Sequence, residues 1–446
     1  MRVSKPMKPL VALGATVALV SLAACSSSDD ADGDASTAPV DCAAYDTYGD
    51  LSGKTVNVYA GFRGTEGELL DASFDAFREC TGAKVVYEGS AEFEAQIQVR
   101  AEAGNLPDIS FHGQPGMVAT LVDMGAVVEA PAAVAENVDT YWTPAWKDYG
   151  TVDGTFYAAP LGASVKDYVW YSPSMFADGG YTIPTTLDEL LTLSQDIVDD
   201  GGVPWCEGFE SGEATGWPGT DWLEEMVLRY AGEQVYDQWV AGEVRFSDAS
   251  IIEAFEGVAA FLKNPDFVNG GLGGVDSIAT TGFADAGLPI ADGQCYMHRA
   301  STTYGANYSD DVTIAEDGDI YAFYFPGVAA DDLYLLGGGE FVTAHDDRPE
   351  VQAFQTYLST PEWANQRAAQ GQWYSANNGL DLEFVASDLD KQAAQLLTDP
   401  DAIFRFDASD LMPSSVGAGS FWTGMTDWIL GASNEDTAAF IDSTWP

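Results

Sequence analysis

The hydrophobic positions of the chain follow strand and helix periodicities in turn from residue 54 onward. Residues 55–60 are typical of a strand. Leu70, Phe74 and Phe77 then recur at helical spacing, which predicts one helix that ends at Gly82. The chain therefore opens with a strand followed by a helix.

A second cycle of strand, helix and strand follows directly. Residues 84–87 predict a strand, residues 91–103 a helix closed by Gly104, and residues 108–111 another strand. Strands that alternate with helices indicate an α/β protein with a parallel sheet covered on both sides. Ligands of such sheets bind at the carboxyl ends of the strands. We expect three loops to line that edge: 61–65, 88–90 and 112–116.

The middle of the chain changes from strand-like to mainly helical character. Residues 157–171 are partly hydrophobic and strand-like. A helix is predicted over 187–198 after Thr186, because Asp188 and Glu189 occupy its first turn, where the helix dipole favours negative charge.

The N-terminus has the composition of an export signal. Three basic residues within the first eight positions precede an apolar run at 10–24 that contains no charge. This run is too short to cross a bilayer comfortably as a permanent helix, which needs about 20 residues. We therefore expect residues 1–24 to be a signal peptide that is removed.

Cys25 follows Leu-Ala-Ala, and this tetrapeptide resembles the bacterial lipobox, in which the cysteine is acylated. Residues 26–40 are mainly Ser, Asp, Ala and Gly, the composition of a flexible tether. The sequence thus predicts that residues 25–40 form a tether, lipid-anchored through palmitate to the extracellular face of the cell membrane. The alternative is an ordinary secretory signal in which Cys25 has no role.

Charge narrows the range of ligands. The formal net charge is −52, and loss of the three basic residues of the signal peptide makes it −55. Such a surface repels anions, so nucleic acid is not expected as a partner and a neutral or cationic ligand is favoured. The alternative is that acidity only keeps an extracellular protein solvated.

Cysteine and histidine show no metal-binding spacing. If Cys25 is lipidated, four cysteines can pair in three ways in an extracellular protein. These four are Cys42, Cys80, Cys206 and Cys295. The histidines lie apart from one another and from any cysteine or carboxylate that would complete a metal site. We expect structural roles for His112, His298 and His345, and neither a metal nor a cofactor.

Several segments together resemble the extracellular solute-binding proteins of ABC sugar importers, in particular the branch that binds α-glucosides. No single segment is decisive, but they occur in the family's order over nearly the whole mature chain. The segments are 106–109 (LPDI), 114–116 (QPG), 168–173 (YVWYSP), 205–212 (WCEGFESG), 215–222 (TGWPGTDW), 295–299 (CYMHR), 337–339 (GGG), 412–413 (MP) and 421–422 (FW).

The resemblance implies a two-lobe, periplasmic-binding-protein-like α/β fold similar to maltose-binding protein, with the ligand cleft between lobes joined by hinge segments. Residues 41–161 and 336–378 would form the first lobe, and residues 162–335 and 379–446 the second. This division favours the disulfides Cys42–Cys80 and Cys206–Cys295, because each pair then lies in one lobe. It also implies a monomer that delivers its ligand to ABC permease subunits with an associated ATPase.

A sugar site needs aromatic platforms and fixed polar groups for the hydroxyls. By resemblance and position we expect ligand contacts from Phe62, Arg63, Glu66, Gln114, Lys166, Glu210, Ser211, Trp217, Arg299, Gly338, Gly339, Glu340, Trp373, Trp422 and Asp427. Alternatives remain open for three of them. Arg63 could pair with Glu66 at the surface, and Trp217 could pack in the core. Lys166 precedes Asp167, where the family usually has serine, which puts its contact in doubt.

The predicted function is the binding component of an importer for a neutral α-glucoside such as maltose, trehalose or sucrose. One alternative is a secreted glycoside hydrolase, because Glu210 and Asp221 lie near tryptophans. Hydrolysis requires a pair of carboxyl groups roughly 5 to 10 Å apart, and no such pair is evident. Another alternative is a carrier for a non-sugar solute, for example a cationic one.

Overall fold

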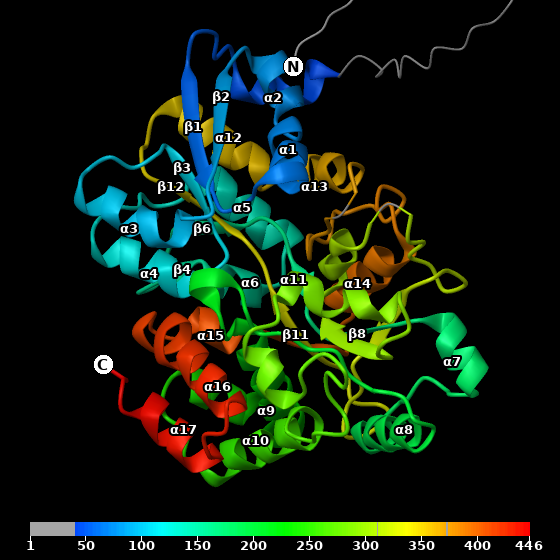
Figure 1. The fold of residues 1–446 in the computed structure, drawn as a ribbon. Helices are drawn as coiled ribbons and strands as arrows, with labels where there is room; N and C mark the ends of the chain where they lie inside the picture. Colours follow the sequence, from blue (N-terminus) through cyan, green and yellow to red (C-terminus); the bar gives the residue numbers. More distant parts are fainter. Residues whose placement is uncertain (1–40, 310, 372) are drawn as a thin grey trace, which may run out of the picture. The chain divides into compact units, whose positions relative to one another are not determined.

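The computed structural model describes residues 41–309, 311–371 and 373–446. Its largest sheet has five strands and includes the three strands that open the chain (Figure 1). The strand order is β2-β1-β3-β12-β6. The three predicted strands are parallel, with Val58 opposite both Tyr87 and Ile109, whereas β12 runs antiparallel to β3 and β6. The bounds are β1 (Thr55–Ala60), β2 (Lys84–Gly89), β3 (Ile109–His112), β6 (Ala158–Pro160) and β12 (Phe341–Ala344).

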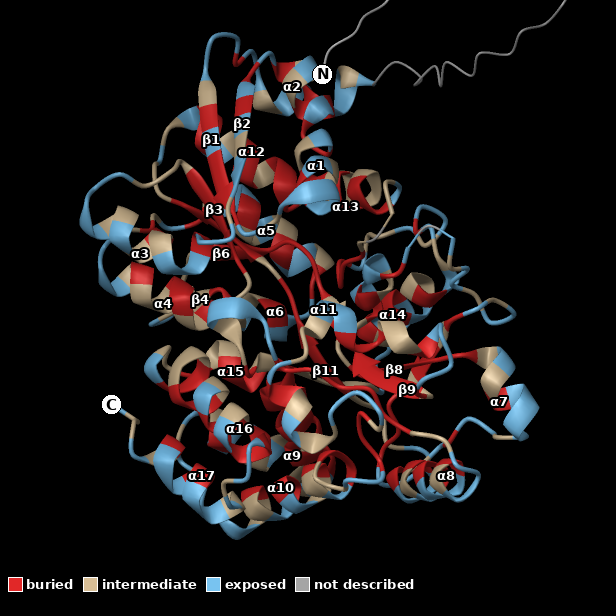
Figure 2. Ribbon diagram, in the orientation of Figure 1, coloured by how far each residue is buried: buried red, intermediate tan, exposed pale blue. Residues whose placement is uncertain are grey.

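Helices cover both faces of this sheet, whose central strands are buried (Figure 2). On one face, Tyr59 packs with apolar residues of α3 and α4. On the other, the Phe74 ring lies 6.4 Å from Phe111 of β3 and 5.1 Å from Phe354 of α12. The helices of this lobe are α1 (Gly64–Ala72), α2 (Asp75–Thr81), α3 (Phe93–Glu102), α4 (Pro115–Asp123), α5 (Ala132–Tyr141), α6 (Pro144–Tyr149), α12 (Pro349–Leu358) and α13 (Pro361–Ala368).

The prediction of a single helix before Gly82 is wrong, because the helix is interrupted at Ser73 and forms α1 and α2 instead. The Ser73 hydroxyl donates to the Leu70 carbonyl at 2.6 Å, and the Ser73 carbonyl accepts from the Tyr357 hydroxyl at 3.1 Å. The Trp363 indole N–H donates to the Ser73 hydroxyl oxygen at 3.1 Å. These contacts come from residues far along the chain, which local periodicity does not reveal.

The second lobe contains two three-stranded sheets, β10-β8-β9 and β13-β11-β7, and most of the long helices. The C-terminal helices α16 and α17, red in Figure 1, pack against α9 and α10. The strands are β7 (Ser164–Val165), β8 (Tyr168–Tyr171), β9 (Met297–Ala300), β10 (Tyr321–Tyr324), β11 (Tyr334–Gly338) and β13 (Ile403–Phe406). A separate hairpin, β4 (Thr151–Val152) and β5 (Thr155–Phe156), precedes β6 in the first part of the chain. The helices are α7 (Pro173–Gly179), α8 (Leu187–Asp199), α9 (Trp217–Val240), α10 (Ala249–Leu262), α11 (Phe283–Ala286), α14 (Asp388–Thr398), α15 (Ala408–Leu411), α16 (Trp422–Ile429) and α17 (Asn434–Asp442).

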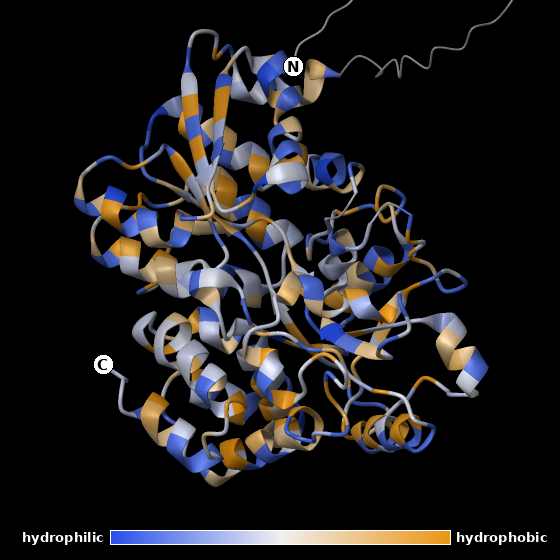
Figure 3. Ribbon diagram, viewed as in Figure 1, coloured by the Kyte–Doolittle hydropathy of each residue, from blue (hydrophilic) through white to orange (hydrophobic). Residues whose placement is uncertain are grey.

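Helix α8 confirms the prediction made from its first turn. The Thr186 side chain accepts from the Glu189 backbone N–H at 3.2 Å and caps the helix. Leu190 and Ile197 lie on the buried side of the helix, and hydrophilic residues occupy much of its other side (Figure 3). An amphipathic helix of this kind contributes one apolar face to the core of its lobe.

The chain crosses between the sheets at Leu161–Ala163 and at Gly339–Glu340. A Cβ atom on Gly339 would lie 2.5 Å from the Gly162 carbonyl oxygen and 2.8 Å from the Trp146 ring. Only glycine permits this approach of the two backbones. The glycine-rich segment thus has a packing function at the crossing.

Two disulfides fasten separate parts of the chain. Cys42 is bonded to Cys80 at the end of α2, and Cys206 to Cys295 just before β9. This is the pairing that the resemblance favours. The predicted signal peptide, the lipidated Cys25 and the tether lie outside the described residues.

Lys166 and Asp167 follow the first crossing, and their charges are held in the interior. The Lys166 ammonium donates to Asp221 at 2.9 Å and to Asp407. Asp167 is fully buried, pairs with the Arg229 guanidinium of α9 at 2.9 Å and accepts from the Leu336 backbone N–H of β11 at 2.7 Å. A charge removed from water is tolerated only when it is paired, so these bonds fix both crossing strands to α9 and to the segment after β13.

Two of the three histidines meet on Ser110 of β3. His345 Nδ1 donates to the Ala126 carbonyl at 2.6 Å, so its Nε2 accepts from the Ser110 hydroxyl at 2.6 Å. His112 Nε2 donates to the same hydroxyl at 2.7 Å, while its Nδ1 is buried without a partner. A proton on that Nδ1 would be an unbonded buried donor. Burial, and secondarily His345, lower the pKa of His112 to about 3.

We expect Lys166→Met to lower the free energy of unfolding by about 3–5 kcal/mol, because Asp221 and Asp407 would lose a buried counter-charge. The matched control is Lys391→Met, since Lys391 lies 3.3 Å from the exposed Asp388 at the surface. That variant should lose at most about 1 kcal/mol. Urea titrations measure both values, and equal losses would contradict a structural role for the buried ammonium.

Folding should also depend on pH through His112. Its folded pKa lies below its ordinary value of 6.5, so its contribution is complete above pH 6.5 and is lost as the pH falls. Between pH 6.5 and about 5.5, the unfolding free energy of the wild type should fall by about 1 kcal/mol more than that of His112→Gln. Identical pH dependence in the two proteins would refute this.

Candidate ligand-binding cleft

A cleft of about 590 Å³ lies between the two lobes and is lined by both. This volume is within the usual range of small-molecule sites, about 300–1,000 Å³. Its walls are Arg63, Ala91, Glu92, Glu94, Ala95, Gln114 and Met117 from the first lobe, and Ser211, Gly212, Glu213, Ala214, Ser414, Ala418 and Trp422 from the second. Four of the predicted ligand residues, Arg63, Gln114, Ser211 and Trp422, are therefore brought together.

The first-lobe wall arises from the carboxyl ends of parallel strands, as the sequence predicted. Arg63 follows β1 and directly precedes α1, and Gln114 follows β3 and directly precedes α4. The N-terminal part of α3 contributes Glu94 and Ala95 after β2. Parallel strands end at one edge of a sheet, which is why these three loops meet.

The second-lobe wall depends on Glu210, although Glu210 itself is not among the lining residues. Its carboxylate accepts from the Gly212 backbone N–H at 2.8 Å and fixes the turn that presents Ser211. Thr215 completes the turn, since its hydroxyl accepts from the Ser211 N–H and donates to the Gly212 carbonyl. A Cβ on Gly216 would lie 2.0 Å from the Trp422 carbonyl oxygen, so this loop packs tightly against the start of α16.

Trp422 is the one aromatic residue among the described residues that line the cleft. It follows a π-helical segment, Ser415–Phe421, that is rich in small residues. Ser414 and Ala418 line the cavity beside it, so they leave room next to the indole ring. Its Nε1 is buried and has no hydrogen-bond partner among the described residues. Trp422 thus supplies apolar surface to the cleft, while its Nε1 is covered by protein.

Charge in the cleft is predominantly negative. Among the described residues that line the cleft, Glu92, Glu94 and Glu213 outnumber the one cation, Arg63. Glu94 is exposed to the cleft, but protein surrounds it on several sides, and this loss of water raises its pKa to about 7. Arg63 forms no ion pair with Glu66 among the described residues, so its donors are available to a ligand.

Four other predicted residues surround a smaller recess beside the cleft. Phe62, Glu66, Glu340 and Trp373 line it together with Arg367, and its volume of about 10 Å³ suits one water molecule or one hydroxyl group. Arg367 is buried, its Nε has no partner among the described residues, and burial lowers its pKa to about 10. Burial, and then the neighbouring Glu66, raise the pKa of Glu340 to about 7. Sequence reasoning missed Arg367, which lies within a helix without a distinguishing motif.

The remaining predicted residues do not line either cavity. Lys166 is bonded to carboxylates, and Arg299 donates to Asp221 at 3.1 Å and to Glu225 at 2.6 Å, so both charges are used inside the protein. Trp217 packs edge-on against Phe283, with ring centroids 4.5 Å apart. Asp427 is exposed on α16, five residues after Trp422 and thus about 140° around the helix. Gly338 lies beside Ser164 at the crossing.

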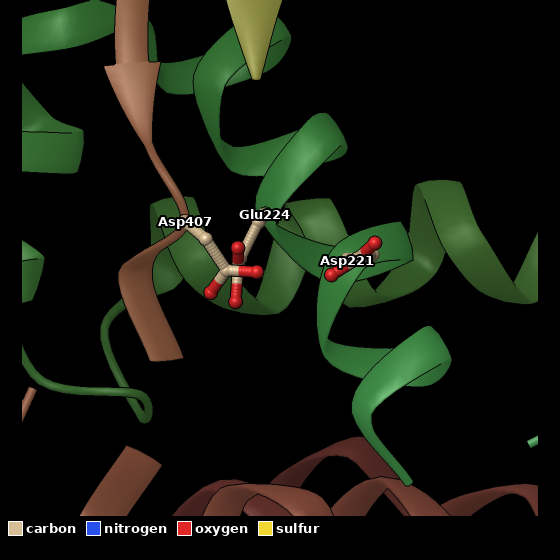
Figure 4. A group of neighbouring side chains, drawn as sticks. All are labelled: Asp221, Glu224 and Asp407. Atoms are coloured by element: carbon tan, nitrogen blue, oxygen red, sulfur yellow. The ribbon is translucent and has the colours of Figure 1, made fainter. Parts of the chain in front are cut away.

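Three buried carboxylates from α9 and the end of β13 form a cluster that sequence reasoning missed (Figure 4). Oxygen atoms of Asp221, Glu224 and Asp407 lie within 4.8 Å of one another, a spacing that a metal ion could use. Lys166 already bonds two of them, and Glu224 accepts from the backbone N–H groups of Ala408 at 3.0 Å and Ser409 at 3.1 Å. The cluster thus has internal partners and holds the start of α15 in place.

The two aspartates of this cluster differ in proton affinity. Burial raises the pKa of Asp221 to about 6 although Lys166 and Arg299 oppose the shift. Burial would also raise the pKa of Asp407, but Lys166 and a hydrogen bond from Ser409 bring it down to about 2. Asp407 therefore carries the negative charge that Lys166 neutralises.

No helix within the described ranges combines the length and apolar character that a bilayer-spanning segment requires.

Comparison with known proteins identifies the family. Residues 63–365 match the model of the bacterial extracellular solute-binding proteins. The osmoprotective compounds-binding protein GgtB of Synechocystis sp. is 35% identical over 402 residues, which cover 89% of this chain and 94% of that protein. The alpha-glucosides-binding periplasmic protein AglE of Rhizobium meliloti is 34% identical over 408 residues, which cover 89% and 88%.

The fold agrees with this match. The solved structure of apo RafE from Streptococcus pneumoniae superimposes with a TM-score of 0.69 at 17% identity, covering 88% of this chain and 98% of that one. The two-lobe α/β fold expected from the sequence is confirmed. The chain belongs to the bacterial extracellular solute-binding proteins, and it is a binding protein rather than the hydrolase that its carboxylates and tryptophans left open.

Proposed function

We propose that this protein is the binding component of an ABC sugar importer and that it takes a neutral α-glucoside of disaccharide or oligosaccharide size. The observation that carries the proposal is the cleft between the lobes, where Arg63 and Gln114 line the first-lobe wall and Trp422 lines the second-lobe wall. The name of AglE, an α-glucoside-binding protein that is similar over nearly the whole chain, supports the same ligand class.

Each part of the cleft suits one part of a sugar. The Trp422 ring offers a platform for the C–H face of a pyranose, and Arg63 and Gln114 supply donors for hydroxyl groups. Glu94 and Glu213 supply acceptors. The ligand would touch both lobes at once only when they are closed, so its binding energy shifts the population toward the closed form.

We further propose that the lobes divide near the expected boundaries, with residues 41–161 in the first lobe and residues 162–335 in the second. Strand β11 pairs with β7 and β13, so we place the return crossing at Gly339–Glu340 rather than at residue 336. Residues 336–338 would then stay in the second lobe, and the segments 341–378 and 379–446 would complete the first and second lobes.

The lipid anchor and the partners complete the proposal. Acylated Cys25 would hold the protein at the outer face of the membrane, where a tether raises its concentration beside the permease and its ATPase. We propose that it acts there as a monomer.

One feature favours a second ligand class. The carboxylates of the cleft outnumber Arg63, which suits a polyhydroxylated or cationic osmolyte, and the relative GgtB is named for binding osmoprotective compounds. Calorimetry with maltose, trehalose and sucrose beside small osmolytes separates the two classes.

Trp422→Ala should weaken binding of the preferred glucoside by about tenfold or more, because the stacking platform is lost. Trp445→Ala is the matched control, since Trp445 is similarly half-buried, is also a C-terminal tryptophan and does not line the cleft. Isothermal titration calorimetry measures both affinities. An equal loss in the two variants, or none in Trp422→Ala, would argue against this site.

Cys25→Ser should release the protein from the membrane fraction and abolish labelling by radioactive palmitate in the cells that express it. Ser26→Ala, one position along the same segment, should leave both unchanged. Retention of Cys25→Ser in the detergent phase after Triton X-114 partition would contradict the anchor.

A further inference from the structure

The two lobes also meet away from the crossing strands, where Trp146 and Tyr149 of α6 pack on β13 and where α4 approaches α15. A Cβ atom on Gly116, the second residue of α4, would lie 3.0 Å from the Met412 carbonyl oxygen and 3.2 Å from that of Asp410. The Leu411 carbonyl oxygen would lie 3.6 Å away. Gly116 thus rests directly on three consecutive backbone carbonyls of the opposite lobe.

The contact is favourable in charge as well as close in distance. The first N–H groups of α4 carry partial positive charge, and carbonyl oxygens at the end of a helix carry partial negative charge. The carbonyls belong to main chain that Glu224 and Asp407 fix through Ala408, Ser409 and Asp410, so they cannot move aside like the tip of a flexible side chain.

The position of this contact links it to the ligand. Gln114 and Met117 lie on either side of Gly116 along the first-lobe wall of the cleft, and Ser414 follows Met412 along the second-lobe wall. The separation of α4 and α15 is therefore coupled to the distance between the two walls.

We propose that Gly116 is a positioning residue for closure, and that its missing side chain lets the first lobe dock on residues 410–412 of the second. This proposal rests on the closing mechanism of the proposed function. A methyl group at this position would hold the walls apart by a few tenths of an ångström, while the open form would accommodate it without a clash.

The test compares Gly116→Ala with Gly113→Ala, three residues earlier in the loop that leads into α4. A Cβ on Gly113 would meet no atom within 4 Å, so this variant is a matched control. Gly116→Ala should bind the glucoside about tenfold more weakly than Gly113→Ala in calorimetry. Its thermal midpoint should not fall, because alanine is a better helix former than glycine.

A second measurement works without any ligand. Spin labels on cysteines at the exposed positions Val99 of α3 and Leu430 after α16, introduced into the full chain carrying Cys25→Ser, report the distance between the lobes. Gly116→Ala should shift the distribution toward longer distances, and Gly113→Ala should not. If no glucoside binds any variant, the proposed ligand is wrong while the distances still test closure.

Identical distances and affinities in the two variants would overturn the proposal. So would a fall of the Gly116→Ala thermal midpoint by several degrees, because the clash would then be present in every state of the folded protein rather than in the closed one.

Discussion

Two adjacent charges at the crossing between the lobes, Lys166 and Asp167, constrain much of the structure. Neither can stay in the interior unpaired, and their partners come from α9, from β11 and from the segment after β13. The same carboxylate cluster fixes the N-terminus of α15 through Glu224. The need to pair these two charges thus connects β7 and β11 to α9 and to the segment after β13, which leads into the second-lobe wall of the cleft.

The cleft combines parts that are fixed in different ways. The first-lobe wall follows from sheet topology, because the loops after parallel strands end at one edge. The second-lobe wall depends on side-chain hydrogen bonds, for example the one that the Glu210 carboxylate accepts from the Gly212 N–H. It also depends on glycines that permit close backbone contact. A ligand that bridges Arg63 and Trp422 would therefore join the edge of the five-stranded sheet to a wall that local hydrogen bonds hold in place.

The sequence predicted the elements whose signals are local. The strand at 55–60 and the capped helix after Thr186 are present, and Arg63 and Trp422 meet in one cavity. Other candidates acquire their partners from residues that are distant in the sequence. Lys166 and Arg299 look like ligand donors until the fold supplies buried carboxylates from α9.

Other features gave no signal at all in the sequence. Ala91 and Ala418 line the cleft, but small apolar residues occur throughout the chain and carry no chemical mark.

The most direct test of the account is a crystal structure of the mature protein grown with the α-glucoside that binds most tightly. The account predicts a sugar ring stacked on Trp422, with hydroxyl groups bonded to Arg63 and Gln114. A sugar bound elsewhere on the protein, with this cleft empty, would contradict it.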